Sequence, residues 1–150
     1  MDKAVNTTLE TTADPLPREL AFLGEQLAAF NDSDVGASGR KTLVVFVRDE
    51  NGAIVAGISG YTAWGWLYVQ WLWVDGRLRG RHMAGRMLEA AEQEAIVRGC
   101  HGALIDTFNP KAASAYERQG YRPFGVLPDF PVGRSRIFLQ KKLAGGCLAG

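Results

Sequence analysis

Residues 67–74, with the sequence LYVQWLWV, form a short run in which all residues but one are apolar or aromatic. Side chains of a strand alternate between the two faces of a sheet. Both faces of this run are apolar, with Tyr68, Leu72 and Val74 on one and Leu67, Val69, Trp71 and Trp73 on the other. A strand of this kind is covered on both sides. We therefore predict that it is the central strand of a sheet.

The residues that follow combine positive charge with little side-chain bulk. RLRGRHMAGRML (77–88) contains four arginines together with Gly80, Ala84 and Gly85. The first N–H groups of a helix lack internal partners, and the helix dipole adds about half a positive charge there. Such a turn can cradle a phosphate, and arginines pair with its oxygens. A surface helix end with scattered arginines is the alternative, but the position after a central strand favours ligand binding.

Composition narrows the classes of protein that fit. The chain has 150 residues, which suits a single domain over 1–143 with a flexible tail over 144–150. A net charge of +1 disfavours a nucleic-acid partner. Cys100 and Cys147 have neither disulfide-framework nor zinc-ligand spacing, so we expect no metal. No signal peptide or membrane-spanning run is visible, and we expect a cytoplasmic protein without a membrane partner.

Periodicity and turn residues predict the order of the elements. We expect an edge strand over 4–11 and then a helix over 15–31, capped by Asp14, with apolar residues at helical spacing. Further strands are expected over 42–47, 53–62, 67–74, 101–107, 121–126 and 136–141, and further helices over 80–98 and 110–119. This order predicts a mixed α/β sheet with helices on both faces.

Two motifs carry a resemblance to a known family. The patterns of a P-loop and of a dinucleotide-binding turn are absent. LWVDGRLRGRHMAGRML resembles the acetyl-CoA-binding motif of the GNAT family of N-acetyltransferases, in which a strand ending in Val leads through a turn into [QR]xxGx[GA]. NPKAASAYERQGY (109–121) resembles that family's NxxAxxxYxxxGF pattern. The resemblance implies the acyl-CoA N-acyltransferase (GNAT) fold, with a six- to seven-stranded mixed sheet, and acetyl-CoA as the acyl donor.

The resemblance also implies roles for individual residues. Backbone groups of Trp73 and Val74 would pair with the pantetheine arm as an added strand does. Asn109 would meet the pantetheine or the acyl end, and Tyr116 would return a proton to the leaving thiolate. The pyrophosphate would be held by N–H groups of the turn, namely Arg79, Gly80, Arg81, His82, Met83 and Ala84. His82 departs from the family's glycine, and its side chain could crowd the pyrophosphate, point outward or add a donor.

The implied reaction is direct attack of an amine on the thioester. A lysine-like amine has a pKa near 10.4, so its neutral form costs roughly 4–5 kcal/mol at pH 7, which a base would offset in part. Many family members carry a glutamate on the central strand, but residues 63–74 contain no carboxylate. Asp106 is the best substitute, with a turn-capping role as its alternative. Tyr116 is the expected acid, with a core position as its alternative.

Three functions remain open at this point. The first is an N-acetyltransferase acting on a small-molecule amine, and the second is a non-catalytic acyl-CoA-binding or regulatory domain. The third, a protein acetyltransferase, ranks lower because the chain has no extra recognition module. We expect Trp71 and Trp73 to be core or dimer contacts, and Trp64 and Trp66 to be covered by a partner. A homodimer is the default assembly.

Overall fold

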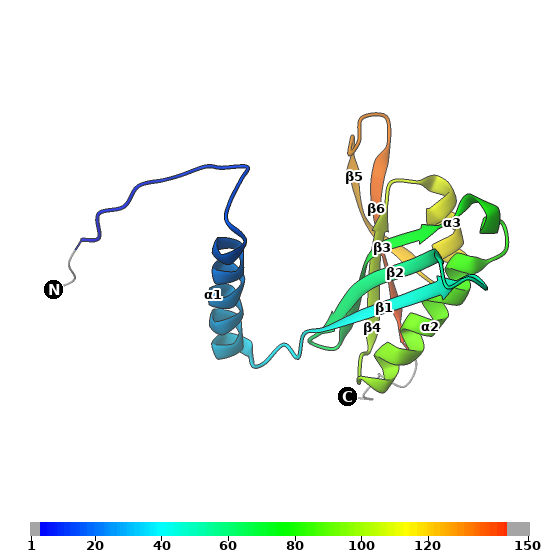
Figure 1. The fold of residues 1–150 in the computed structure, drawn as a ribbon, viewed down its shortest axis with the longest axis horizontal. Coiled ribbons are helices and arrows are strands. Elements are labelled where there is room, and N and C mark those ends of the chain that lie inside the picture. Colours follow the sequence, from blue (N-terminus) through cyan, green and yellow to red (C-terminus); the bar gives the residue numbers. More distant parts are fainter. Residues whose placement is uncertain (1–3, 144–150) are drawn as a thin grey trace. The chain divides into compact units, whose positions relative to one another are not determined.

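The computed structural model describes residues 4–143, and the chain divides into two compact units, Met1–Ser38 and Gly39–Gly150. The first unit contains the helix α1 (Pro17–Val35). The second contains a six-stranded sheet with two helices (Figure 1). The expected tail over 144–150 lies outside the described residues, and the single domain over 1–143 stays a prediction.

The sheet of the second unit has the strand order β1-β2-β3-β4-β6-β5. β3 pairs with β4 in parallel, and the other neighbours are antiparallel. The mixed sheet and the central position of β3 are thereby confirmed. The elements are β1 (Lys41–Arg48), β2 (Ile54–Ala63), β3 (Trp66–Val74), α2 (Met83–Val97), β4 (Gly102–Thr107), α3 (Pro110–Arg118), β5 (Arg122–Pro128) and β6 (Ser135–Lys142), with a short 3-10 helix, η1, at Gly76–Leu78.

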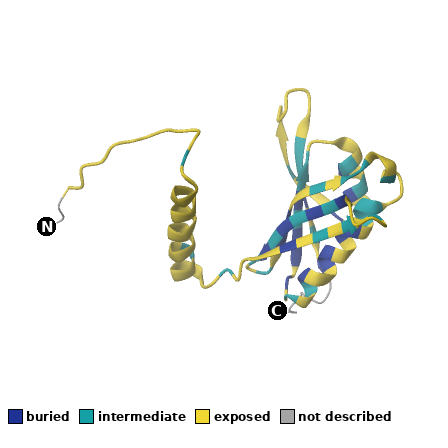
Figure 2. Ribbon diagram, in the orientation of Figure 1, coloured by how far each residue is buried: buried dark blue, intermediate teal, exposed yellow. Residues whose placement is uncertain are grey.

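Buried residues gather between the sheet and α2 (Figure 2). Tyr116 of α3 belongs to the same core. Ala91 and Ala95 of α2 are fully buried, and their small side chains let the helix approach the strands closely. Leu67 and Val69 of β3 meet this helix from the sheet. Within the second unit, the face of β1 to β3 that points away from this core carries exposed apolar side chains: Val44, Phe46, Trp71 and Trp73.

The prediction for the faces of β3 is wrong beyond Val69, because a β-bulge intervenes. Ser59 pairs with Trp71 and Gly60 pairs with Val69, so Gln70 is an extra residue. The alternation of side chains is shifted by one at this point. Leu72 and Val74 therefore pack against the core, whereas Trp71 is 74% exposed and is not a core residue. Gly60 makes the bulge feasible, since a Cβ there would collide with the carbonyl oxygen of Tyr68.

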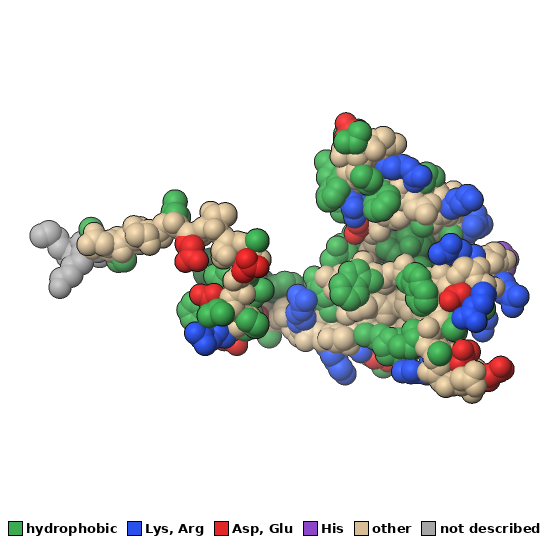
Figure 3. Space-filling view, turned by 45° about the horizontal axis from the view of Figure 1, so that its top comes forward, with side chains coloured by type: hydrophobic (Ala, Val, Ile, Leu, Met, Phe, Trp, Pro, Cys, Tyr) green, Lys and Arg blue, Asp and Glu red, His purple; other side chains and the backbone are tan. Residues whose placement is uncertain are grey.

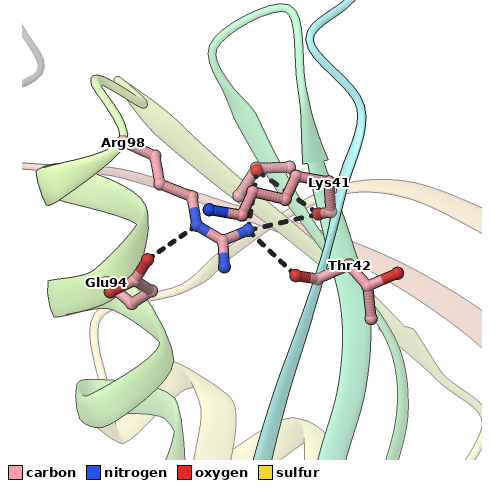
Figure 4. Close-up of polar contacts among 5 residues, drawn as sticks. Lys41, Thr42, Glu94 and Arg98 are labelled. Carbon is pink, nitrogen blue, oxygen red and sulfur yellow. Dashed lines mark hydrogen bonds and ion pairs between the residues drawn. The ribbon is translucent and has the colours of Figure 1, made fainter.

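The C-terminal end of α2 is tied to the sheet by Arg98, which follows the helix (Figure 4). Its guanidinium donates to Oε2 of Glu94 at 2.7 Å and to the backbone carbonyls of Lys41 and Thr42 at 3.2 and 3.1 Å. It also donates to the Thr62 hydroxyl at 3.1 Å. These contacts fix α2 against β1 and β2, so the opposite end of the helix has a defined position at the end of β3.

Two predictions for the first unit are wrong. Residues 4–11 form no strand, and Val5 and Leu9 are exposed. The segment therefore buries no apolar side chain that could offset the conformational entropy lost when a strand forms. α1 begins at Pro17 rather than at Pro15. Oε1 of Glu19 accepts from the backbone N–H of Leu16 at 2.8 Å, so Glu19 rather than Asp14 serves the start of this helix.

Candidate active site

The parallel ladder between β3 and β4 runs from Trp66 opposite Gly102 to Val69 opposite Ile105. β3 then continues to Val74 without a registered partner on β4. A pocket of about 270 Å³ opens where the two strands separate, and Trp71, Trp73, Asp106 and Tyr116 are among its lining residues. A strand whose backbone groups are not taken up by a neighbour can pair with an extended ligand.

Tyr116 reaches this pocket from α3. Its side chain is only 4% exposed and packs against the core, with its ring edge-on to that of Tyr121. Burial, with a smaller contribution from the nearby Asp106 charge, raises the pKa of Tyr116 to about 12. The hydroxyl is therefore protonated at neutral pH and can serve as a proton donor.

Asp106 lies in the same pocket with both carboxylate oxygens engaged. Oδ1 accepts from the Tyr68 hydroxyl at 3.3 Å, and Oδ2 accepts from Nη1 of Arg136 at 3.0 Å. Burial first, and then Asp106, raise the pKa of Tyr68. This arrangement gives Asp106 a structural role in holding β3, β4 and β6 together. Its role as the base stays a prediction.

Arg136 is a site residue that the sequence did not reveal. It reaches the pocket from β6, and its guanidinium lies over the rings of Phe130 and Phe108, at 4.0 and 5.2 Å from the centroids. Its Nε atom is buried and has no hydrogen-bond partner among the described residues. The contact with Asp106 spans 30 residues and depends on the pairing of β4 with β6, for which no local motif exists.

The turn after β3 differs from the predicted continuous helix over 80–98. α2 begins at Met83, because Gly80 and His82 both have left-handed backbone conformations, with φ of 78° and 57°. His82 thus adopts the conformation that favours the glycine of the family pattern. In the described chain no side chain caps the start of α2, so its first N–H groups remain available for an anion.

The arginines of this turn have different surroundings. Nε of Arg79 donates to the carbonyl oxygen of Val74 at 3.3 Å, which connects the turn to the end of β3. Arg77 forms an exposed ion pair with Asp75 at 2.9 Å, and hydrogen bonds from Arg77 lower the pKa of that carboxyl group. Arg81 and Met83 line a second pocket of about 300 Å³ together with Arg48 and Asp49.

Asn109 caps α3, the helix that carries Tyr116. Its Oδ1 accepts from the backbone N–H groups of Lys111 and Ala112 at 2.9 and 3.4 Å. This capping role explains why the second motif begins with an asparagine. The contact of Asn109 with pantetheine stays a prediction.

Among residues 4–143, no cluster of three or more His, Cys, Asp or Glu side chains could hold a metal ion. No helix in that range has the length and apolarity to cross a membrane.

Comparisons with known proteins agree with this geometry. Residues 8–121 match the sequence model of the acetyltransferase (GNAT) family. The acetyltransferase Atu2258 of Agrobacterium fabrum is 41% identical over 118 residues, which cover 79% of this chain and 86% of that protein. The blasticidin-S acetyltransferase of Streptomyces morookaense is 37% identical over 95 residues, which cover 63% of this chain and 70% of that protein.

The fold also matches a crystal structure of a protein from Agrobacterium tumefaciens with a TM-score of 0.84 and 38% identity. The match covers 92% of this chain and 99% of that one. The family match and these relatives agree with the two sequence motifs and with the separation of β3 from β4. The chain therefore belongs to the acetyltransferase (GNAT) family.

Proposed function

We propose that this protein transfers the acetyl group of acetyl-CoA to the primary amine of a small molecule, by direct attack of the amine on the thioester. The observation that carries the proposal is the position of Tyr116. Its protonated hydroxyl belongs to the pocket that opens where β3 separates from β4. A proton donor beside an open strand edge suits the departure of a thiolate from a ligand bound along that edge.

The residues present fit acetyl-CoA. The backbone of Trp73 and Val74 lies on the part of β3 without a partner on β4, where an extended pantetheine arm could pair. The start of α2 has no side-chain cap, and the N–H groups of the turn from Arg79 to Ala84 suit a pyrophosphate. His82 meets the backbone requirement of the turn without a glycine.

The pKa of Tyr116 shapes the proposed chemistry. Acetyl-CoA supplies the thioester whose carbonyl a neutral amine attacks. A thiol ionises near pKa 8.5, so donation from a tyrosine with a pKa of about 12 is uphill by roughly 3–4 units, or about 5 kcal/mol. Tyr116 therefore gives up its proton as it regains one from the amine. It acts as a relay that carries a proton from the attached nitrogen to the leaving thiolate, whereas the neutral amine that attacks must lose its first proton to another base or to water.

The acceptor is proposed to be a small molecule rather than a protein. The pocket of about 270 Å³ is rimmed by exposed aromatic rings and carries one ion pair, Asp106 with Arg136. A relative is named for the acetylation of blasticidin-S, which supports an acceptor of this size. A cytoplasmic location belongs to the same proposal, and the free, buried thiol of Cys100 suits a reducing compartment.

The test is amine-dependent release of CoA. Purified protein with acetyl-CoA is given a panel of small amines that includes blasticidin-S, a lysine peptide, and no acceptor. We expect release with at least one small amine, and its loss in Tyr116→Phe. Acetyl-CoA binding without turnover on any amine would favour the non-catalytic alternative. Turnover on the peptide alone would favour a protein acetyltransferase.

A further inference from the structure

Glu92 is a buried acidic residue of α2 that does not line the pocket between β3 and β4. Its side chain is 6% exposed, and both of its carboxylate oxygens accept hydrogen bonds. Nζ of Lys141 on β6 donates to Oε1 at 2.7 Å, and the hydroxyl of Tyr121 donates to Oε2 at 2.8 Å. Charged side chains ordinarily stand at the surface, as the blue and red side chains of the second unit do in Figure 3. The buried position of Glu92 therefore calls for a physical reason.

Stability alone is a weak reason for this ion pair. Removal of two charges from water carries a large penalty, and replacement of a buried ion pair by apolar residues of similar volume is often neutral or stabilising. What the pair supplies is direction, because each of its hydrogen bonds requires a particular distance and angle. The elements that it connects therefore show what it is for.

Lys141 holds the C-terminal end of α3 as well as Glu92. Its Nζ donates to the backbone carbonyl of Gln119, the residue that ends α3, at 2.8 Å. Its side-chain carbons lie close to Gly120, where an added Cβ would be 3.3 Å from Cε of the lysine. The last carbonyls of a helix lack internal partners and form the negative end of its dipole, so an ammonium group is favourable there. One ammonium group thus joins the end of α3 to α2.

Tyr121 forms a second connection between the same two helices. Its hydroxyl donates to Glu92, and its backbone N–H donates to the carbonyl of Tyr116 at 3.0 Å. Its ring lies edge-on to that of Tyr116, with the centroids 6.5 Å apart. Burial, followed by the charge of Glu92, raises the pKa of Tyr121, so its hydroxyl remains a donor at neutral pH. The two connections therefore meet α3 at Tyr116 and three residues beyond it.

The position of α3 depends strongly on contacts of this kind. The helix has nine residues, of which only Ala113 and Tyr116 are buried. Most of a helix's stability in a protein comes from tertiary packing, and a face of two residues provides little of it. Asn109 caps the start of α3, whereas Lys141 and Tyr121 hold its end. Loss of the contacts at the end would allow the last turn, which carries the proposed proton donor, to move.

We propose that Glu92 and Lys141 are positioning residues for the reaction, which hold the end of α3 so that the Tyr116 hydroxyl lies in the pocket. The inference rests on the proton-donor role proposed for Tyr116. Neither positioning residue lines the pocket, so both act through α3. A displacement of about 1 Å in a reacting group can cost on the order of 10²-fold in rate. The start of α2 is not part of these contacts, so the chemical step should suffer more than the binding of acetyl-CoA.

The test is a double-mutant cycle on kcat, measured with an amine that is turned over. Glu92→Gln with Lys141→Met removes the contact with Gln119 without leaving an unpaired buried charge. We expect kcat to fall about 10–100-fold, with the affinity for acetyl-CoA kept within about threefold. In the Tyr116→Phe background the same two changes should lower kcat by less than about threefold, because the positioned group is gone. An equal fall in both backgrounds, or no fall in the natural one, overturns the proposal.

Glu89→Gln with Lys142→Met is the matched control, since it makes the same two substitutions at exposed positions of α2 and β6. It should leave kcat and the affinity for acetyl-CoA unchanged. Thermal melting identifies a variant that does not fold. If the Glu92→Gln/Lys141→Met protein is such a variant, Glu92→Gln alone enters the cycle with the same two outcomes, because it keeps an acceptor for the Tyr121 hydroxyl.

A spectroscopic measurement that needs no turnover separates this proposal from the proposed function. In protein labelled with ¹³C-tyrosine, the ring signal of Tyr116 is the one lost in Tyr116→Phe. We expect this signal to shift in Glu92→Gln/Lys141→Met and to stay in place in the matched control. A shift in a protein that turns over no amine supports the positioning of Tyr116 although the proposed reaction fails. An unchanged signal overturns the positioning whatever the activity.

Discussion

Val69 lies opposite Ile105, and this pair ends the parallel ladder between β3 and β4. One residue further along β3, Gln70 is the extra residue of a bulge against β2. The two irregularities occur at the same level of the sheet. Together they turn Trp71 and Trp73 to a new face and separate the end of β3 from β4, so the pocket originates in the geometry of the sheet.

Gly60 is the position that permits the bulge, and Gly60→Ala is expected to destabilise the protein. The added methyl would collide with the carbonyl oxygen of Tyr68, and relief requires a shift of backbone. We expect a loss of about 1–3 kcal/mol in the free energy of unfolding, measured with urea, and weaker binding of acetyl-CoA. Gly24→Ala, where the added methyl meets open space, is the matched control. Unchanged stability in Gly60→Ala would show that the bulge does not depend on this close approach.

Tyr116→Phe is expected to lower kcat by about 10²–10⁴-fold, because it removes the proton that the departing thiolate takes. The ring remains, so packing against Tyr121 and the affinity for acetyl-CoA should be kept. Steady-state kinetics and calorimetry on the same preparation separate the two effects. A kcat within a few-fold of the natural enzyme would remove Tyr116 from the chemistry.

The pH dependence of the reaction follows from the same tyrosine. Its pKa is raised to about 12, so the protonated, active form persists as the pH rises toward that value. Activity should rise with pH as the amine loses its proton, without a loss from Tyr116 ionisation between about pH 7 and 10. A descending limb in this range that is present in the natural enzyme and absent in Tyr116→Phe would contradict the raised pKa.

Substitutions of His82 test whether the turn requires a left-handed backbone conformation at this position. Its φ is 57°, a conformation that is strained for residues other than glycine by about 1–3 kcal/mol. His82→Gly should keep acetyl-CoA binding and overall stability, because glycine adopts this conformation readily. His82→Val should lose both, since a β-branched residue is poorly accommodated there. Equal behaviour of the two variants in thermal melting and calorimetry would show that the turn tolerates another conformation.

The sequence predicted the parts of the fold that have local causes. The apolar run 67–74 predicted the central strand, and the β-rich composition of 42–47 predicted β1. The sequence of β3 alone could not predict the bulge at Gln70, because the bulge depends on Gly60 of the neighbouring strand β2. The ion pair of Asp106 with Arg136 likewise arises from pairing between distant strands. The helical spacing of Leu20, Leu23 and Leu27 likewise has a local cause, and it predicted α1.

Calorimetric titration of acetyl-CoA shows whether the turn after β3 binds this ligand. The natural protein is compared with an Arg79→Glu/Gly80→Asp variant and with Arg122→Glu, which reverses a charge on β5. We predict binding that weakens about tenfold or more in the turn variant, as expected for the loss of at least one charge-assisted contact, and that is unchanged in Arg122→Glu. No binding to the natural protein, or equal binding to all three proteins, would show that this turn does not hold acetyl-CoA.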